Sequence, residues 1–321
     1  MSTPDVDLII IGAGPAGLTA AQYGARSNLS VLMLEQLAPG GQVLLIDTLE
    51  NYPGIAPGKT GFEFSTELHH QAEEFGAKFL NEQALNLQKE NELFVVTLSS
   101  GQTRRAPAII IATGAKHRKL GIPGEEELYG RGVSYCATCD GPFFKNKKIF
   151  VVGGGDAACD EAQFLSRLTK EVVLVHRRER FRAQKALAER TLHNPNIQVR
   201  FNTVMKEIKG TPSPGGKVAS VVLERNGNEL YEENAGAVFI FTGTTPQTSL
   251  VSGENGGPKA ELDENGYIIT DQNMASSVPG LFAAGDVRAT PFRQVVTAAA
   301  DGAVAAHSAA AYIESLKGEA Y

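Results

Sequence analysis

The sequence contains few cysteines, no excess of basic residues and no long hydrophobic run. Three cysteines in 321 residues are too few for a secreted disulfide scaffold. The formal net charge of -6 argues against a nucleic-acid-binding surface. Residues 1–7 carry two aspartates and no lysine or arginine, and no segment approaches the roughly 18 apolar residues of a membrane-spanning helix. We therefore expect a cytoplasmic protein with no signal peptide, no membrane association and no nucleic-acid partner.

Two of the three cysteines stand close together. Cys136 and Cys139 form a C-x-x-C motif that is followed at once by Asp140, and this spacing allows the two thiols to close a small disulfide ring. In a reducing compartment a lone C-x-x-C is more often catalytic or metal-binding than structural. Zinc needs four ligands, and the sequence offers no second C-x-x-C, so no metal site is expected. Inert buried cysteines remain an alternative for this pair, and Cys159 is predicted to be a small buried residue.

A glycine-rich motif opens the chain. Residues 8–11 (Leu-Ile-Ile-Ile) indicate a buried parallel strand, and the G-x-G-x-x-G that follows begins a helical segment reaching about Asn28. A second strand, residues 31–34, ends at Glu35. In such a unit the glycines allow a tight turn against a pyrophosphate, and the acid accepts ribose hydroxyls. The residues predicted to touch the nucleotide through this motif are Gly12, Gly14, Ala16, Gly17 and Glu35.

The same pattern recurs in the middle of the chain. Residues 149–152 predict a strand, the following G-x-G-x-x-A begins a helical pattern reaching Leu168, and residues 172–175 predict a second strand that ends at His176. Glu35 and His176 both stand 23 positions after the first glycine of their motif, so the two units are in register. The motif residues predicted to bind the second nucleotide are Gly153, Gly155, Asp156 and Ala157.

The two units differ at the end of the second strand. A carboxylate such as Glu35 repels a 2′-phosphate, whereas guanidinium groups bind one through charge-assisted, bidentate bonds. The second unit places His176, Arg177 and Arg178 there, with Arg180 and Arg182 close behind. The first motif therefore fits FAD or NAD and the second fits NADP, with a solvated basic face as the alternative for the arginines.

The remaining segments predict a nested duplication. Residues 108–112 form a buried strand pattern that ends in Thr113-Gly114, and residues 238–241 end in Thr242-Gly243 in the same way. We expect the chain to enter a second domain just after Gly114 and to leave it just after Gly243. Further predicted elements are a packing helix at 61–78 with His69 and His70 on its surface, strands at 93–98, 197–201, 204–208, 217–224 and 280–286, and a helix from about 294 to 316.

In combination these motifs resemble those of the low-molecular-weight, bacterial-type thioredoxin reductases, the class II pyridine nucleotide-disulfide oxidoreductases, over essentially the whole chain. The residues that carry the resemblance are Gly12 to Gly17, Gly40-Gly41-Gln42, Cys136 to Asp140, Gly153 to Ala158, His176-Arg177-Arg178 with Arg182, Gly285-Asp286 and Arg293-Gln294.

The resemblance implies an α/β fold with two Rossmann-like dinucleotide-binding domains, each of three ββα layers. The FAD-binding domain would be discontinuous, covering 1–114 and 247–321, and the NADPH-binding domain with the C-x-x-C would cover 115–246. Besides the first motif, the residues expected at FAD are Gly41, Gln42, Asn51, Ala112, Gly114, Gly285, Asp286, Arg293, Gln294 and Val295. Besides the second motif, the residues expected at NADPH are His176, Arg177, Arg178 and Arg182.

The resemblance also implies a reaction: electrons pass from NADPH to FAD, then to the Cys136–Cys139 disulfide, and finally to the disulfide of thioredoxin. Cys139 would face the flavin, Cys136 would attack thioredoxin, and Asp140 would be the acid–base group. A homodimer is expected, and so is a rotation of the two domains about linkers near 114–117 and 244–247. A flavoprotein that serves ferredoxin or flavodoxin and an NADPH-responsive redox sensor remain the alternatives.

Overall fold

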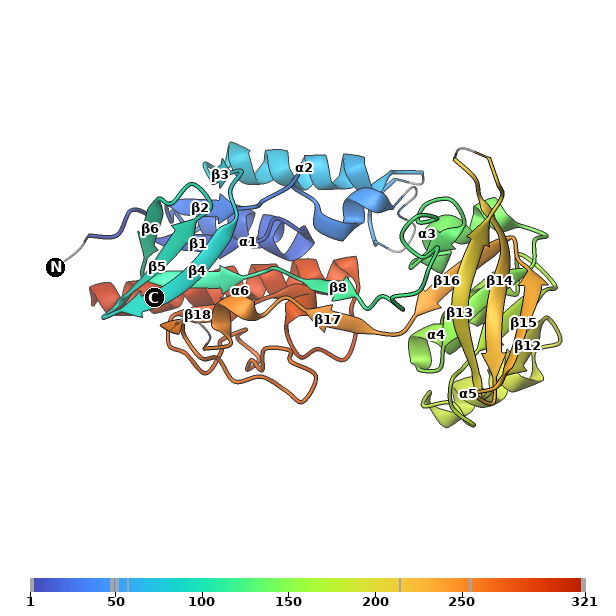
Figure 1. Cartoon of the computed structure of the whole chain (residues 1–321). Coiled ribbons are helices and arrows are strands. Elements are labelled where there is room, and N and C mark those ends of the chain that lie inside the picture. The colour runs from blue at the N-terminus through green and yellow to red at the C-terminus, as the bar shows by residue number, and fades with distance from the viewer. Residues whose placement is uncertain are drawn as a thin grey trace. The chain divides into compact units, whose positions relative to one another are not determined.

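The computed structural model describes residues 3–46, 49, 52–56, 58–213, 215–253 and 256–318, apart from the side chains of Leu45 and Cys139. The chain divides into a first unit, Met1–Lys116 with Thr245–Tyr321, and a second unit, His117–Thr244. Two short strands, β8 (Ala115–His117) and β17 (Thr244–Pro246), pair with each other where the chain passes from one unit to the other (Figure 1).

The first unit is built on a parallel sheet in the strand order β18-β7-β1-β2-β3. The strands are β1 (Leu8–Ile11), β2 (Val31–Leu34), β3 (Lys78–Leu80), β7 (Ala108–Ile111) and β18 (Leu281–Ala283). An antiparallel sheet contains β4 (Ala84–Glu90), β5 (Leu93–Leu98) and β6 (Thr103–Ala106). The helices are α1 (Pro15–Arg26), α2 (Gly61–Glu74) and α6 (Val295–Lys317), with short helices η1 (Gly41–Leu45), η3 (Ser249–Val251) and η5 (Gly285–Val287).

The alternation of side chains along β1 separates two apolar cores in this unit. Leu8 and Ile10 pack on one face with residues of α1 and α6, whereas Ile9 and Ile11 pack on the other face with Phe94 and its neighbours of the antiparallel sheet. Burial on both faces explains why β1 is apolar along its whole length. The unit therefore has three layers, which are helices, parallel sheet and antiparallel sheet.

The second unit repeats this arrangement. Its parallel sheet has the order β12-β11-β10-β16-β9, formed by β9 (Val133–Ser134), β10 (Ile149–Gly153), β11 (Val172–Val175), β12 (Ile197–Arg200) and β16 (Ala237–Phe241). The antiparallel strands are β13 (Thr203–Gly210), β14 (Val218–Arg225) and β15 (Glu229–Asn234). The helices are α3 (Ala137–Asp140), α4 (Asp156–Leu165) and α5 (Lys185–His193), with the short helix η2 (Gly141–Phe144).

The two faces of β10 again contact different layers. Ile149 and Val151 pack with α4, and Phe150 and Val152 pack with residues of β13 and β14. The predicted fold class, two α/β units each with ββα layers on a parallel sheet, is confirmed.

Some of the predicted elements are wrong at their ends. The helix predicted at 61–78 ends at Glu74, because Gly76 has φ +96° and Lys78 already begins β3. Phe75, predicted in the packing face, is 44% exposed and lies under the guanidinium of Arg26. The helix after the second motif stops at Leu165, three residues before the predicted end.

One of the two histidines of α2 also differs from the prediction. His70 is exposed as expected, but His69 is only partly exposed and its ring packs edge-on against Phe79, with centroids 5.1 Å apart. Cys159 is a fully buried free thiol, as predicted.

Candidate functional site

The first glycine motif forms a turn with no room for side chains on its inner side. A Cβ on Gly12 would lie 2.4 Å from the carbonyl oxygen of Ala112, and one on Gly17 would lie 1.9 Å from the carbonyl oxygen of Gly12. Gly14, the N-cap of α1, is open on its outer side, where a Cβ would meet no atom within 4 Å. No side chain caps the helix, so its first amide groups face an open space that suits a pyrophosphate.

Glu35 follows β2 beside this turn. Its Oε2 accepts a hydrogen bond from the Ala13 amide at 3.0 Å, and its Oε1 accepts one from the Leu37 amide at 3.0 Å. The two bonds hold the carboxylate at the carboxyl end of the strand. Each oxygen keeps a second lone pair, so the group can still accept ribose hydroxyls.

Further predicted residues surround the same turn. The Gly40 amide donates to the Ala13 carbonyl at 2.6 Å, and a Cβ on Gly41 would lie 3.3 Å from Gly14 Cα. Gln42 Nε2 donates to the Ala115 carbonyl at 2.5 Å. Of the other predicted residues, Ala112 is buried and Gly114 has φ +68°. Asn51 lies outside the described residues.

Asp286 lies in η5, directly after β18. Burial raises the pKa of Asp286, the nearby charge of Arg293 lowers it, and the charge of Asp301 raises it. The guanidinium of Arg293 lies 4.0 Å from the centroid of the Tyr267 ring. Gln294 is the N-cap of α6 and Val295 is its first residue, so a second helix N-terminus begins close to Asp286 in the sequence.

The second glycine motif has the same open outer side. Gly155 is the N-cap of α4, no side chain caps that helix, and a Cβ on Gly155 would meet nothing within 4 Å. Asp156 Oδ1 accepts a hydrogen bond from the Gln184 amide at 2.7 Å, and the Arg182 amide donates to the Gly154 carbonyl at 2.7 Å. These two bonds attach the arginine-rich segment to the glycine turn.

His176 and the arginines have different environments. The His176 side chain is buried, and its ring lies so close to Gly154 that a Cβ there would be 2.1 Å from it. The pKa of His176 is lowered, because burial and the charges of Arg182, Arg178 and Arg177 outweigh a backbone hydrogen bond with Arg180 that raises it. Arg177, Arg178 and Arg182 are exposed. The histidine therefore packs beneath the turn, and the guanidinium groups are available to a phosphate.

The C-x-x-C begins where β9 ends. The Cys136 amide donates to Ser134 Oγ at 3.0 Å, and Asp140 donates its amide to the Cys136 carbonyl at 3.2 Å across the short helix α3. Cys136 is disulfide-bonded and Cys159 is not. The Cys139 side chain is not described. In the part of the chain that the structure describes, no three His, Cys, Asp or Glu side chains gather as a metal site.

Some contacts at these sites could not be read from sequence motifs. Asp156 and Gln184 are 28 residues apart, and the Arg288–Asp301 ion pair behind Asp286 joins a loop to α6. Charge of opposite sign was the only available signal for the second pair.

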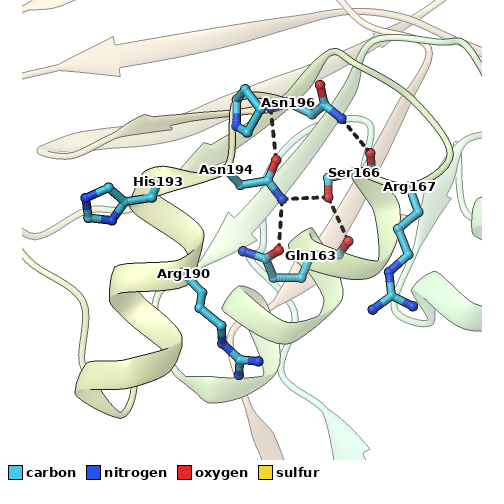
Figure 2. Close-up of a pocket in the computed structure, with 8 residues that line it drawn as sticks. Gln163, Ser166, Arg167, Arg190, His193, Asn194 and Asn196 are labelled. Atoms are coloured by element: carbon cyan, nitrogen blue, oxygen red, sulfur yellow. Dashed lines mark hydrogen bonds between the residues drawn. The ribbon is translucent and has the colours of Figure 1, made fainter.

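An open depression, lined by Gln163, Ser166, Arg167, Arg190, His193 and Asn194 to Asn196, lies at the carboxyl ends of α4 and α5 (Figure 2). It contains none of the predicted site residues, and those of the second glycine motif lie at the opposite end of α4.

The described helices include none that is both long and apolar enough to cross a membrane. The sequence profile of the pyridine nucleotide-disulphide oxidoreductases matches residues 6–302. The thioredoxin reductase of Treponema pallidum (strain Nichols) is 54% identical over 314 residues, which cover 98% of this chain and 99% of that protein.

Two crystal structures are similar over nearly the whole chain. The thioredoxin reductase of Streptococcus pyogenes MGAS5005 has a TM-score of 0.79 and 42% identity, covering 97% of this chain and 98% of that one. The Lactococcus lactis thioredoxin reductase has a TM-score of 0.75 and 40% identity, covering 97% of this chain and 100% of that one. The chain therefore belongs to the pyridine nucleotide-disulphide oxidoreductase family and, within it, to the thioredoxin reductases.

Proposed function

We propose that this chain uses NADPH to reduce the disulfide of a thioredoxin, with electrons passing through FAD and a Cys136–Cys139 disulfide. Thioredoxin reductases contain FAD and use NADPH, and these cofactors supply the hydride transfer that side chains cannot perform. The observation that carries the proposal is the disulfide-bonded Cys136, which follows the edge strand of the unit that also bears the arginine-lined turn.

We assign FAD to residues 1–114 and 247–321. The open N-terminus of α1 at Gly14 fits a pyrophosphate, and the oriented carboxylate of Glu35 fits a ribose without a 2′-phosphate. Asp286 and the start of α6 complete this set of predicted contacts. In this assignment the amides at the start of α6 would stabilise negative charge on the flavin.

NADPH is assigned to residues 115–246. The open turn at Gly155 would bind the pyrophosphate, and the exposed guanidinium groups of Arg177, Arg178 and Arg182 would bind the 2′-phosphate. The hydrogen bonds from the Gln184 amide to Asp156 and from the Arg182 amide to Gly154 support this assignment, because they attach the arginine segment to the turn.

The two cysteines of the C-x-x-C together can carry out the thiol–disulfide exchange with thioredoxin. The thiolate of reduced Cys136 attacks one sulfur of the thioredoxin disulfide and releases the other sulfur as a thiolate. The Cys139 thiolate then attacks Cys136 Sγ, which releases thioredoxin as a dithiol and re-forms the Cys136–Cys139 disulfide. Two electrons leave the enzyme in this exchange, and Asp140 donates and accepts the protons as thiol and thiolate change roles.

The dithiol must react with the flavin in one half-reaction and with a protein in the other, so we also propose that the units rotate about residues 114–117 and 244–247. The paired strands β8 and β17 occupy these linkers. A covalent crosslink between the units is expected to stop turnover and to leave both cofactors bound. Unimpaired multiple turnover in the crosslinked enzyme would contradict the rotation.

The decisive experiment measures thioredoxin reduction and flavin reduction in the same variants. Cys136→Ser and Cys139→Ser should both abolish NADPH-dependent thioredoxin reduction, whereas NADPH should still bleach the flavin absorbance. Cys159→Ser is the matched control, because Cys159 is a buried free thiol outside the C-x-x-C. Unchanged thioredoxin reduction in the first two variants would reject the proposed path. A single flavin reduction without catalytic cycles in the wild type would instead indicate a redox sensor.

A further inference from the structure

Asp301 is an acidic residue in the interior of α6 whose side chain is only 14% exposed. Its Oδ2 accepts a hydrogen bond from the backbone amide of Gly285 at 3.2 Å. Gly285 is the first residue of η5, and Asp286 is the next. The carboxylate of a helix residue thus holds the turn that carries Asp286.

Arg288 is the ionic partner of this carboxylate. Its Nη1 donates to the same Oδ2 at 3.1 Å, and its Nε donates to Thr270 Oγ1 at 2.8 Å. The side chain of Arg288 is 13% exposed, so both members of the pair are largely removed from water. Removing one member of a buried ion pair leaves an uncompensated charge, and this destabilises the protein by more than the intact pair stabilises it.

The backbone around the pair has no space in which to adjust. Gly285 has φ +76°, and a Cβ there would lie 2.9 Å from the Ala16 Cβ in the first turn of α1. A Cβ on Gly302, next to Asp301, would lie 2.1 Å from the Ala16 carbonyl oxygen. The segment around Asp301 therefore contacts both the first glycine motif and the turn before Asp286.

From these contacts we propose that Asp301, together with Arg288, is a positioning residue that sets the placement and the charge state of Asp286 for flavin nucleotide binding. This inference rests on the FAD site of the proposed function. The charged groups that act on the Asp286 carboxyl are Arg293, which favours its ionised form, and Asp301, which disfavours it. Asp301 thus affects Asp286 in two ways, through the Gly285 amide and through its charge.

The test is the release of FAD from the holoenzyme, followed by the rise of free-flavin fluorescence at several pH values. Asp301→Asn keeps an acceptor for the Gly285 amide but removes the charge and strands Arg288, so the Kd for FAD should rise roughly tenfold. The pH at which FAD affinity falls on acidification should move lower, because Asp286 loses a negative neighbour. Lys317→Met is the matched control on the same helix, since the Lys317–Asp7 pair is more exposed than the Arg288–Asp301 pair.

A second variant keeps the test independent of folding. Arg288→Met/Asp301→Asn leaves no stranded charge and should fold like the wild type. On acidification, its FAD affinity should still fall at a lower pH than that of the wild type. The proposal would be overturned if both variants kept the wild-type Kd for FAD and lost FAD affinity at the wild-type pH. A higher Kd for FAD, with the affinity still falling at the wild-type pH, would also overturn it, because the pair would then act through packing alone. If the wild type itself failed to bind FAD, the proposed function would be wrong instead.

Discussion

In the first unit β2 is followed by Glu35, and in the second β11 is followed by His176, although both strands consist of four buried residues paired in parallel with the motif strand. Glu35 remains at the surface of the turn as a hydrogen-bonded carboxylate. His176 is buried under Gly154, and the exposed positions beyond it are arginines. One backbone frame therefore presents opposite charges at the same place, which suits two different dinucleotides.

The edge strands show a second difference between the units. β18 lies beside β7 and leads into Gly285 and Asp286, and β9 lies beside β16 and leads into Cys136. The carboxyl ends of parallel strands lie at the edge of the sheet where ligands bind. Equivalent positions of the duplicated fold thus carry an acid in one unit and a disulfide-bonded cysteine in the other. The chemistry changes at the strand ends while the layers are repeated.

The largest expected effect tests whether the two glycine turns are equally tight. Gly17→Ala should destabilise the first unit by about 1–3 kcal/mol or more, because its Cβ would lie 1.9 Å from the Gly12 carbonyl oxygen. The second unit already has Ala158 at this position. Thermal unfolding and FAD retention measure the effect.

Gly14→Ala is the matched control, because its Cβ enters open space. It should weaken FAD binding and leave the stability of the FAD-free protein nearly unchanged. A Gly17→Ala protein as stable as the wild type would show that the first turn can relax like the second.

A smaller effect is expected from the charges that distinguish the two turns. Arg178→Gln removes one charge-assisted contact to a 2′-phosphate, so the KM for NADPH should rise about 10- to 100-fold. The KM for NADH should not change, because NADH lacks that phosphate. Steady-state kinetics with both nucleotides check this. Arg190→Gln, an exposed arginine of the depression in Figure 2, should change neither value. A similar rise for both nucleotides would assign Arg178 a role outside 2′-phosphate recognition.

The sequence predicted the apolar strands well, but it missed polar strands at the edges of the antiparallel sheets. Residues 8–11 and 31–34 match β1 and β2, because strands buried on both faces are continuous apolar runs. β6 and β15 were missed because their sequences, Thr-Arg-Arg-Ala and Glu-Leu-Tyr-Glu-Glu-Asn, are mainly polar. Such strands form through pairing with a neighbour, which a local pattern does not record.

The same limit applies to the sites. The glycine turns could be predicted because strand, turn and helix are consecutive in the chain. The hydrogen bond from the Gln184 amide to Asp156 and the ion pair Arg288–Asp301 depend on tertiary proximity, so no spacing rule indicates them. Their discovery required the folded structure.

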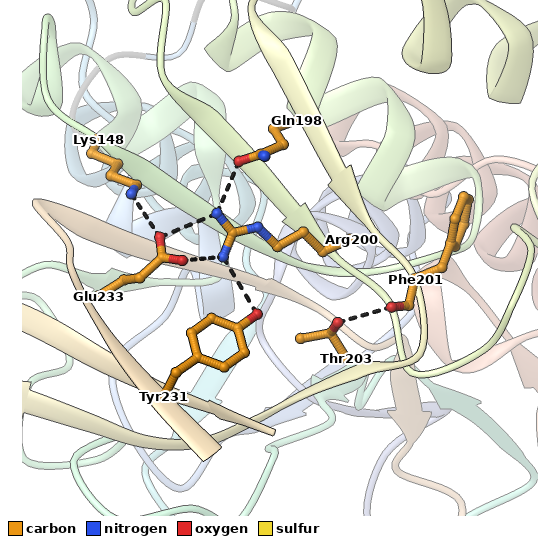
Figure 3. Close-up of polar contacts among 7 residues, drawn as sticks. All are labelled: Lys148, Gln198, Arg200, Phe201, Thr203, Tyr231 and Glu233. Atoms are coloured by element: carbon orange, nitrogen blue, oxygen red, sulfur yellow. Dashed lines mark hydrogen bonds and ion pairs between the residues drawn. The ribbon is translucent and has the colours of Figure 1, made fainter. Parts of the chain in front are cut away.

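The smallest expected effect concerns the link between the two sheets of the second unit. Glu233 of β15 binds Arg200 of β12 through both carboxylate oxygens, and it also accepts from Lys148 Nζ at 2.7 Å (Figure 3). Burial alone would raise the pKa of Glu233, but the bonds from Arg200 and Lys148 hold it below its usual value. Apolar contacts join the layers in both units, and in the second unit this network supplements them.

Because the folded-state pKa of Glu233 is lowered, its contribution to stability is complete above the unfolded pKa of about 4.3 and is lost as the pH falls through the folded value. Glu233→Gln should therefore lower the free energy of unfolding by about 1 kcal/mol at pH 7, and the difference from the wild type should shrink below about pH 4. Urea unfolding at both pH values measures this. Glu232→Gln is the control, since the Glu232–Lys209 pair is exposed and should contribute less. Equal losses in the two variants would mean that the network adds nothing beyond an ordinary surface pair, and the second unit would then join its sheets as the first does, through apolar side chains.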